Sequence, residues 1–427
     1  MIFSRAIRKS AFLSLGLLSL AIGFSQNEVK LCGTMEAMSA FYELHPESKK
    51  EAENFEEFTS SYKRSRGAAD CFVIPVVFHV YGTTQSGFAV NNTVIANALA
   101  IVNNDFHASN SDFNTVHNSF SGVKAGMPDI TFALAQFDPS GNPCTGVVYY
   151  PTKSGYGNNT GYDAQIAADA WDNYKYMNVY IQNDLYNNSV FNNSGIAWYP
   201  NTSMSNNKTA RVVYNGAYLG YNTNSEFASV LTHEFGHWLN LIHTFDGGCS
   251  GSNDNVSDTP PCDYSGASYG CHASPTSTGP VSCGNLVNAE NYMDYSGAAG
   301  CYKMFTAGQT TRIYAALQHP ARQPLWQPAN LLAVGLWTLC SPVGINDQEG
   351  LQEDVAYMDL HSNQLYIGKR TQGEEHSYQL NDISGKKILE GSYTALSIQV
   401  DLQQIPSGIY LLEFGPEKNK KHLKVVR

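Results

Sequence analysis

Hydrophobic residues between positions 71 and 243 follow strand-like runs and helix-like spacings in turn. Residues 71–81 form a run of β-branched and aromatic side chains, which predicts a buried strand. Apolar residues recur at helical spacing over 94–106 and predict a helix there. Further strands are predicted at 130–137, 177–182 and 211–214, and a further helix at about 225–239. This alternation predicts an α/β sheet domain, and the part after residue 243 is expected to have little regular structure.

The segment before this domain, residues 26–66, is polar and rich in Glu, Lys and Ser. One helix is predicted in it, at about 43–62, and the segment ends in the basic cluster Lys63-Arg64-Ser65-Arg66. Trypsin-like proteases cut after such residues, so we interpret 26–66 as a propeptide and 63–66 as its cleavage site. A solvated helical linker is the alternative interpretation.

The segment after the domain begins with an expected linker at 328–350 and continues as strands of period two. Residues 378–389 have a hairpin pattern with a turn at Ser384-Gly385, and residues 397–402 and 407–414 follow as further strands. This pattern predicts a small all-β sandwich over 351–427, without a catalytic cluster.

The N-terminus has the three-part layout of a signal peptide. Arg5, Arg8 and Lys9 precede an apolar run at 11–24, and Ser25-Gln26 follows as a cleavage point. A transmembrane anchor is the alternative, but the run is short for a bilayer span. We therefore expect residues 1–25 to be removed from an exported protein that has no membrane span in its mature form.

Composition and charge argue against two classes, disordered proteins and nucleic-acid-binding proteins. Of the 427 residues, 43% are hydrophobic and 15% are charged, which argues against general disorder. The formal net charge of -11 argues against nucleic acid as a partner. Nine cysteines in an exported chain predict disulfides, and the five from Cys249 to Cys301 predict a stapled, loop-rich subdomain. The odd count leaves one thiol over, and Cys32 stands apart from the other eight.

The motif with the clearest chemistry spans residues 232–243. His233 and His237 are four residues apart on a predicted helix, so both rings project from one face and can share a metal. His243 can reach the same metal only if the chain turns sharply near residue 240. Asn240 suits that turn, since Asn adopts the left-handed conformation and ends helices more readily than other non-glycine residues.

Three histidine ligands leave the fourth position of a zinc ion open, which is typical of hydrolytic rather than structural sites. Zinc lowers the pKa of its bound water and polarises a scissile carbonyl. Glu234, beside the first ligand, can take the proton from that water and pass it to the leaving amine. The alternative is a helix with ordinary surface histidines.

The His-Glu-x-x-His-x-x-x-x-x-His pattern, followed by Asn291-Tyr-Met-Asp-Tyr295, resembles the metzincin zinc motif with its Met-turn. Separate short motifs also match in order, namely Val73-Ile-Pro-Val-Val-Phe-His-Val, Trp238, His243-Thr-Phe, Asp258-Thr-Pro and Phe305-Thr-Ala-Gly-Gln. Together they resemble the pappalysin family of metzincin metalloendopeptidases over about 70–320. The resemblance implies a metzincin-like catalytic domain at 67–327, with a mixed twisted sheet, an active-site helix and an irregular, disulfide-bonded C-terminal subdomain.

The resemblance also implies roles for single residues. Met293 would form a hydrophobic floor beneath the zinc, although ordinary core packing is the alternative. Tyr295 would donate its hydroxyl to the oxyanion. Cys32, in Leu-Cys-Gly-Thr, resembles the propeptide cysteine that blocks zinc in latent members, and a lone structural or intermolecular thiol is the alternative. Family members bind calcium near the active site, for which Asp254, Asp258 and Thr259 supply oxygen ligands, although helix capping and turn formation would explain the same residues.

Two features depart from the family pattern. Most relatives have Gly where this chain has Asn240. Members that cleave before Arg or Lys have an acidic residue in the loop after the Met-turn, whereas residues 296–300 contain none. We therefore do not transfer that cleavage preference to this chain.

The C-terminal segment resembles the sorting domain that directs cargo to the type IX secretion machinery. The likeness depends on short motifs at 382–386, 405–411 and 421–427. A β-sandwich that binds carbohydrate or a partner protein is the alternative.

These observations predict a secreted or cell-surface zinc metalloendopeptidase, made as a latent precursor, that cleaves extracellular proteins. A catalytically inactive metzincin scaffold, serving as a surface adhesin or binding module, is the alternative from another class. Glu234 argues against it, because such a scaffold has no need of a general base. A zinc enzyme acting on a non-peptide amide is a third hypothesis, against which the Met-turn argues.

Overall fold

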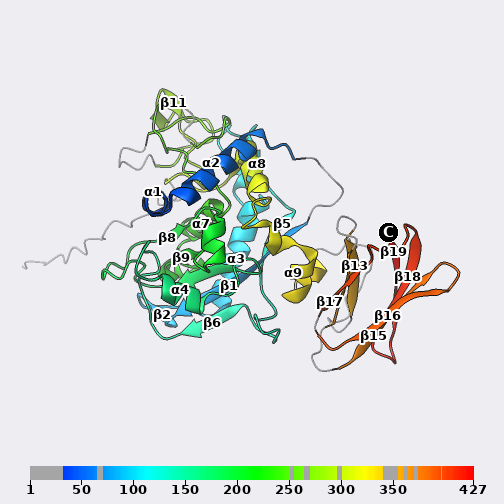
Figure 1. Cartoon of the computed structure of the whole chain (residues 1–427). Helices are drawn as coiled ribbons and strands as arrows, with labels where there is room; N and C mark the ends of the chain where they lie inside the picture. Colours follow the sequence, from blue (N-terminus) through cyan, green and yellow to red (C-terminus); the bar gives the residue numbers. More distant parts are fainter. Residues whose placement is uncertain are drawn as a thin grey trace, which may run out of the picture.

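The computed structural model describes residues 32–64, 71–250, 254–263, 270–295, 301–339, 354–359, 364–369, 374–395 and 397–427 (Figure 1). The predicted signal peptide, Ser65 and Arg66 of the predicted cleavage site, and the loop at 296–300 lie outside the described residues. Among the helices that are described, none is both long and apolar enough to cross a membrane.

A six-stranded sheet forms the centre of the domain that follows residue 71. Its order is β5-β1-β7-β9-β8, with β6 pairing β1 beside β5. The strands are β1 (Phe72–Tyr81), β5 (Ile130–Leu134), β6 (Val147–Tyr150), β7 (Met177–Ile181), β8 (Gly195–Ala197) and β9 (Val212–Tyr214). All pairs are parallel except the edge strand β8, which runs antiparallel to β9. β1 is buried along its whole length, as the continuous apolar run predicted.

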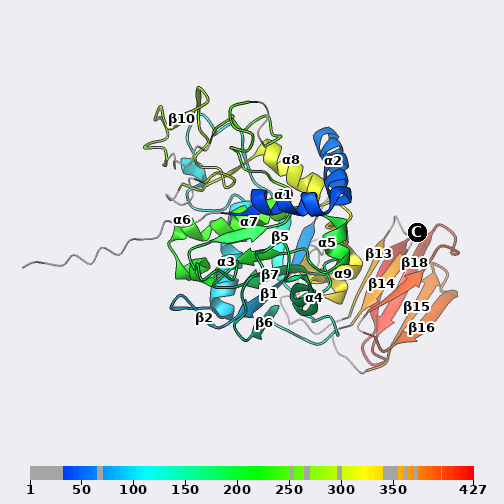
Figure 2. The ribbon, with the colours of Figure 1, turned by 60° about the vertical axis from the view of Figure 1, so that its left-hand side comes forward.

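Helices α3 (Asn92–Phe106) and α7 (Val230–Trp238) cover one face of this sheet (Figure 2). Ile95 and Leu99 of α3 pack with Phe235 of α7 and with alternate residues of β1 in one buried cluster. The predicted strands and the helix at 94–106 are thus confirmed, with small differences at their ends. The helix predicted at 225–239 is interrupted at Ser229, which separates α6 (Ser225–Ala228) from α7.

Smaller elements complete the domain. They are the strands β2 (Thr84–Gln85), β3 (Phe88–Ala89), β4 (Lys124–Ala125), β10 (Val281–Ser282), β11 (Asn285–Leu286) and β12 (Phe305–Thr306), and the helices α4 (Asp163–Asp169), α5 (Thr202–Asn206), α8 (Ala307–Ala316) and α9 (Pro328–Ala333). The sequence pattern did not predict α8, although Thr306 and Gln309 form the capping box that begins it. Helix α9 lies within the segment expected to be a linker, and its Leu331 packs with Val73 and Val77 of β1.

Two disulfides, Cys249–Cys283 and Cys271–Cys301, cross-link the loops after α7, as predicted for this region. Cys71 is also disulfide-bonded. The expectation of a single leftover thiol is wrong, because Cys144 and Cys262 are free as well as Cys32. Buried thiols pack as small apolar groups, so a cysteine count alone does not fix the number of bridges.

The N-terminal segment forms two helices, α1 (Thr34–Leu44) and α2 (Pro46–Ser61), where one helix was predicted. The break falls at His45, because the proline that follows disfavours the helical conformation of the residue before it. Met38 and Phe41 of α1 are buried in an aromatic cluster of the sheet domain that includes Tyr156.

The C-terminal strands form two sheets, of order β13-β14-β17 and β16-β15-β18-β19. They are β13 (Val355–Asp359), β14 (Gln364–Gly368), β15 (His376–Asp382), β16 (Lys387–Tyr393), β17 (Ser397–Asp401), β18 (Ile409–Gly415) and β19 (Lys421–Val426). A shared apolar cluster that includes Leu365, Leu380 and Leu412 lies between them. The predicted all-β sandwich and its β15–β16 hairpin are confirmed, with Gly385 at positive φ in the turn.

Candidate active site

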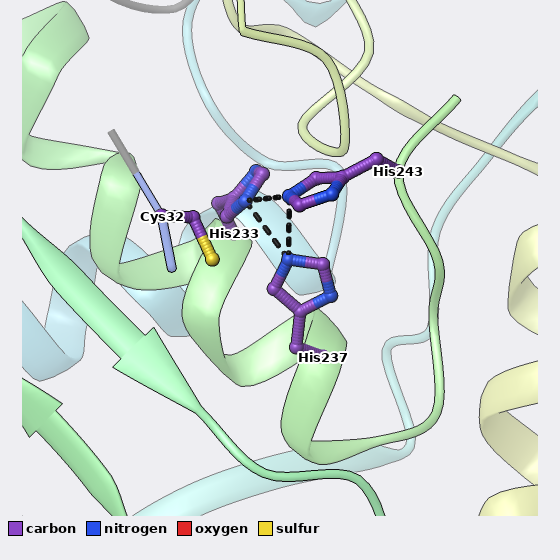
Figure 3. A group of neighbouring side chains, drawn as sticks. All are labelled: Cys32, His233, His237 and His243. Carbon is purple, nitrogen blue, oxygen red and sulfur yellow. Dashed lines mark hydrogen bonds between the residues drawn. The ribbon is translucent and has the colours of Figure 1, made fainter. Parts of the chain in front are cut away.

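Three histidine side chains converge in the interior of the domain (Figure 3). Nε2 of His237 lies 3.0 Å from Nε2 of His233 and 2.9 Å from that of His243, and the third pair is 3.2 Å apart. His233 and His237 lie one turn apart on α7, and His243 belongs to the loop that follows. All three are buried. The structure therefore brings together the residues whose spacing predicted a shared metal.

Backbone carbonyls fix the hydrogen position on two of these rings. Nδ1 of His233 lies 2.6 Å from the carbonyl oxygen of Tyr292, and Nδ1 of His237 lies 2.7 Å from that of Leu241. Each Nδ1 therefore carries the hydrogen of the neutral ring and donates it, and each Nε2 is left unprotonated with its lone pair available. Lone pairs this close repel one another unless a cation lies between them.

The donor set fits zinc. Burial lowers the pKa of His233 to about 4 and holds the pKa values of His237 and His243 well below their usual range, so the rings are neutral and able to bind a metal. A tetrahedral Zn²⁺ with nitrogen ligands at about 2.05 Å requires nitrogen–nitrogen spacings of about 3.3 Å. The observed spacings are close to this value, which supports three imidazole ligands with one position left over.

The sharp turn after α7 occurs where the sequence predicted it. Asn240 has a φ of 68°, in the left-handed region. The N–H of Leu241 donates to the carbonyl of Gly236 at 2.9 Å and closes the helix end. The carbonyl of Leu241 is also the acceptor for His237, so the same turn orients one imidazole and returns the chain to place His243.

Glu234 projects from α7 with a buried carboxyl group. Its Oε2 faces the thiol sulfur of Cys32 at 3.4 Å, and its Oε1 has no hydrogen-bond partner among the described residues. Burial raises the pKa of Glu234 to about 8, and the hydrogen bond from Cys32 partly opposes this change. A buried carboxyl oxygen without a partner next to the histidine cluster is suited to accept a proton there.

Gly195, at the start of the edge strand β8, leaves room for Glu234. A side chain at this position would come within 2.7 Å of Oε1 of Glu234 and of the ring of Tyr214. The sequence analysis missed this residue, because a single glycine far along the chain from the zinc motif has no spacing pattern that links it to the site.

Met293 packs against α7, and its role as a floor beneath the zinc stays a prediction. It is fully buried, and a side chain at Gly236 would come within 2.5 Å of its sulfur. The side-chain amides of Asn291 and Gln309 donate to each other at 2.8 and 3.0 Å, and Oδ1 of Asn291 also accepts from the N–H of Met293. The Met-turn is thereby anchored to the first turn of α8, a role for Gln309 that the short motif alone did not reveal.

Cys32 and Tyr295 meet at the remaining side of the histidine cluster. Sγ of Cys32 lies within 4.8 Å of all three ring nitrogens, and no second such group of His, Cys, Asp and Glu occurs in the described parts of the chain. The hydroxyl of Tyr295 donates to the carbonyl oxygen of Cys32 at 2.7 Å. Burial, and then the charge of Glu234, raises the pKa of the Cys32 thiol well above its usual range, so only a nearby cation would favour its thiolate.

The residues after Cys32 lie against β8, the last strand in the sheet order. The hydroxyl of Thr34 donates to the carbonyl of Ala197 at 3.0 Å and accepts from its N–H at 3.1 Å. A cavity of about 410 Å³ lies beside this contact, between α1 and the catalytic domain. Its lining includes Cys32, Glu36, Tyr186, Asn193 and Ile196. The N-terminal segment therefore occupies the edge of the sheet next to the histidines.

The three residues predicted to bind calcium have hydrogen-bond partners of their own. Asp258 accepts from the hydroxyl of Thr306 at 2.6 Å and from the N–H of Gly308 at 2.8 Å, at the start of α8. Thr259 donates to the carboxylate of Asp254 at 2.7 Å. These contacts agree with helix capping and turn formation, and calcium at these residues stays a prediction.

Comparison with known proteins places this site in a family. Residues 160–318 match the peptidase family described as pregnancy-associated plasma protein-A, and residues 361–427 match the secretion system C-terminal sorting domain. An extracellular metalloprotease of Sordaria macrospora is 32% identical over 317 residues, which cover 71% of this chain and 94% of that protein. An extracellular metalloprotease of Colletotrichum graminicola is 29% identical over 300 residues, which cover 66% of this chain and 88% of that protein.

Solved structures show the same fold. Promirolysin of Tannerella forsythia superposes with a TM-score of 0.52 at 24% identity, covering 70% of this chain and 97% of that one. Mirolysin in complex with a compound has a TM-score of 0.50 at 26% identity, covering 64% of this chain and all of that one.

The predicted resemblances to the pappalysins and to the sorting domain are thus confirmed, as is the metzincin-like α/β fold. The alternative of ordinary surface histidines is wrong, because all three rings are buried. The chain belongs to the pappalysin family of metalloendopeptidases and is a secreted or cell-surface protein.

Proposed function

We propose that this protein is a zinc endopeptidase in which Glu234 is the general base, and that it is made as a latent precursor. The observation that supports this most directly is the group of three buried Nε2 atoms within 3.2 Å of one another, beside the unpartnered Oε1 of Glu234. When bound, zinc supplies Lewis-acid chemistry, in which it acidifies a water ligand and polarises a carbonyl.

The chain's own residues supply the proton transfers. Glu234 takes a proton from the attacking water on its unpartnered oxygen and later gives it to the leaving amine. Gly195 keeps the space around that oxygen clear of side chains. Tyr295 turns its hydroxyl, which donates to the carbonyl of Cys32 in the precursor, to the carbonyl oxygen of the substrate and stabilises the developing negative charge.

Latency is assigned to Cys32. Its sulfur lies where a fourth metal ligand would come, and a thiolate ligand would take the place of the catalytic water. We divide the chain into a signal peptide at 1–25, a propeptide at 26–66, a catalytic domain that begins at 67 and includes α9, a connecting segment after it that ends at 350, and a sorting domain at 351–427.

The activating cut lies in the segment 63–66, but we do not place it directly after Arg64. The guanidinium of Arg64 lies 3.7 Å from the ring centre of Tyr314 and pairs with Asp129 of the catalytic domain. A trypsin-like protease would have to withdraw this side chain from both partners before cutting there. Lys63, in contrast, is exposed.

The substrates are extracellular proteins and peptides, and the C-terminal domain presents the protein to the type IX secretion machinery. The match of residues 361–427 to the sorting domain supports this export route. Removal of the C-terminal domain should therefore leave the protein inside the producing cell, which fractionation of cells and medium would measure.

The decisive experiment is cleavage of a diverse peptide library by protein activated in the 63–66 segment. It is run beside a Glu234→Ala variant and a sample treated with a zinc chelator. Activity lost in both controls, and restored by zinc only in the chelated wild-type sample, is the expected result. A folded, zinc-loaded protein that cleaves no peptide would favour the binding-scaffold alternative instead.

A further inference from the structure

Helix α2 of the proposed propeptide places one carboxylate in a polar site of the catalytic domain. Oε1 of Glu51 accepts from the N–H of Thr202 at 2.9 Å and lies 3.3 Å from Nε2 of His319. Oε2 accepts from the side-chain amide of Asn201 at 2.9 Å and from the hydroxyl of Thr202 at 3.0 Å. Two segments far apart in the chain thus direct four donors at one carboxylate.

The side chains of Asn201 and His319 are oriented by hydrogen bonds that do not involve Glu51. Oδ1 of Asn201 accepts from the N–H of Met204 at 3.0 Å, so the amide nitrogen of Asn201 faces Glu51. Nδ1 of His319 accepts from the N–H of Ala321 at 3.1 Å, which places the hydrogen of the neutral ring on Nε2. The side chains of Asn201 and His319 are almost completely buried, at 1% and 2% exposure. Two of the four donors are therefore held in place by contacts other than those to Glu51.

A buried cation lies close to this site. The guanidinium of Arg322 donates to the carbonyls of Trp238 at 3.1 Å, Ala321 at 3.3 Å and Trp198 at 3.5 Å. Burial lowers the pKa of Arg322 to about 9, and the charge of Glu51 opposes this change. Departure of α2 would leave these donors and the positive charge of Arg322 without their anion, so water or another anion would have to take its place.

Two of the carbonyls that accept from Arg322 belong to residues at the ends of β8 and α7. Trp198 directly follows the edge strand β8, and Trp238 is the last residue of the catalytic helix α7. Arg322 therefore joins the site to the two elements that flank the histidine cluster.

We propose that Asn201, Thr202 and His319 form a receptor for a peptide carboxylate, which Glu51 occupies in the precursor. After activation, the carboxylate comes from an acidic residue of the released propeptide or of a protein substrate. The inference rests on the proposed function, since the receptor is uncovered only when the propeptide leaves.

The first test measures how tightly the cut propeptide stays bound, in the full chain. Glu234→Ala and Cys32→Ser in the background prevent self-digestion and remove the thiol, and a site for a sequence-specific protease replaces residues 65–70. The dissociation constant of the fragment is measured by dilution and native mass spectrometry. Glu51→Gln should raise it on the order of tenfold to a hundredfold, as expected for loss of hydrogen bonds to a charged group.

The matched control is Glu53→Gln, an exposed residue of α2 whose carboxylate pairs with Lys50 of the same helix. On the receptor side, Thr202→Val removes one donor and should weaken binding severalfold, while Ser203→Ala, one residue along, should not. Equal constants for each variant and its control would overturn the proposal. This measurement does not require activity, so it stands even if the proposed peptidase function fails.

The second test distinguishes the two sources of the carboxylate. Peptides with Glu or Gln at each position around the cleavage site are compared by kcat/KM with activated enzyme. A position at which Glu is favoured about tenfold, with the preference lost in Thr202→Val, would assign the receptor to substrates. Absence of any such position, with the dependence on Glu51 retained, would assign it to the propeptide alone.

Discussion

Helices α7 and α2 are attached to the rest of the molecule in different ways. Every residue of α7 is buried, and its Leu231 and Phe235 belong to the main apolar core. In α2, which is longer, only Ser48 and Thr59 are buried. Instead, α2 is attached through Glu51 and through Glu56, whose carboxylate accepts two hydrogen bonds from Arg312 at 2.7 and 2.9 Å.

This difference explains how one helix can be permanent and the other removable. Burial of apolar surface stabilises α7 in proportion to the area removed from water, and no solvent molecule can replace that contribution. Charge-assisted hydrogen bonds are directional and strong, but water or another anion can take the place of either partner. Helix α7 is thus attached by apolar burial and α2 mainly by exchangeable polar contacts, whereas α1 of the same proposed propeptide also buries Met38 and Phe41.

Removal of one of the three clustered histidines should have the largest effect on activity. His243→Ala leaves two imidazoles for the metal, so we expect the zinc content to fall and activity to drop by more than about 100-fold. Loss of a residue that only supports a metal ligand typically costs up to about 100-fold, and loss of a ligand itself should cost more. Zinc per chain by mass spectrometry and peptide cleavage measure this. His422→Ala, exposed in the C-terminal domain, is the control. Unchanged zinc content in His243→Ala would contradict the assignment.

A single methyl group should distinguish the packing of the two helices. Gly236→Ala on α7 would bring a side chain against the sulfur of Met293, and we expect it to lower the free energy of unfolding by about 1–3 kcal/mol. Asn54→Ala, on the exposed face of α2, should change it by less than about 0.5 kcal/mol. Denaturant unfolding measures both. Equal stability of the two variants would show that α7 is packed more loosely than the structure indicates.

The turn after α7 offers a smaller and more local test. Asn240→Gly retains access to the left-handed conformation and should leave the stability nearly unchanged, whereas Asn240→Val should cost about 1–2 kcal/mol. The position of His243 depends on this turn, so kcat should fall in parallel with stability in the Val variant. Equal behaviour of both variants would mean that the backbone conformation at residue 240 is not limiting.

The smallest expected effect concerns pH and the α2 contact. Burial opposes ionisation of Glu51, but hydrogen bonds from His319 and Thr202 prevail and lower its pKa. A carboxylate with a lowered pKa in the bound state stabilises binding above its usual pKa of about 4.3, and the contribution is lost as the pH falls through the lowered value. Binding of the cut propeptide should thus weaken severalfold below about pH 4 in the wild type, and less in Glu51→Gln.

Much of the architecture could be predicted because the spacing of apolar residues along the chain indicates the main strands and helices. The continuous apolar run at 71–81 and the helical spacing at 94–106 match β1 and α3 closely. Helix α8 was missed because its residues lack a strong apolar period, although its capping box was present in the sequence. The helix predicted at 43–62 matches α2 closely, and Pro46 marks its first turn, but the preceding helix α1 was missed.

By itself the sequence determined which three histidines come together and the turn between them, since an i, i+4 spacing on a helix and a left-handed Asn are local properties of the chain. Tertiary structure decided the rest of the site. The space that Gly195 leaves for Glu234, the contact of Thr34 with Ala197 and the receptor for Glu51 each join residues far apart in the sequence. No spacing rule connects such residues, because their proximity arises only when the sheet, α7 and the N-terminal helices have packed together.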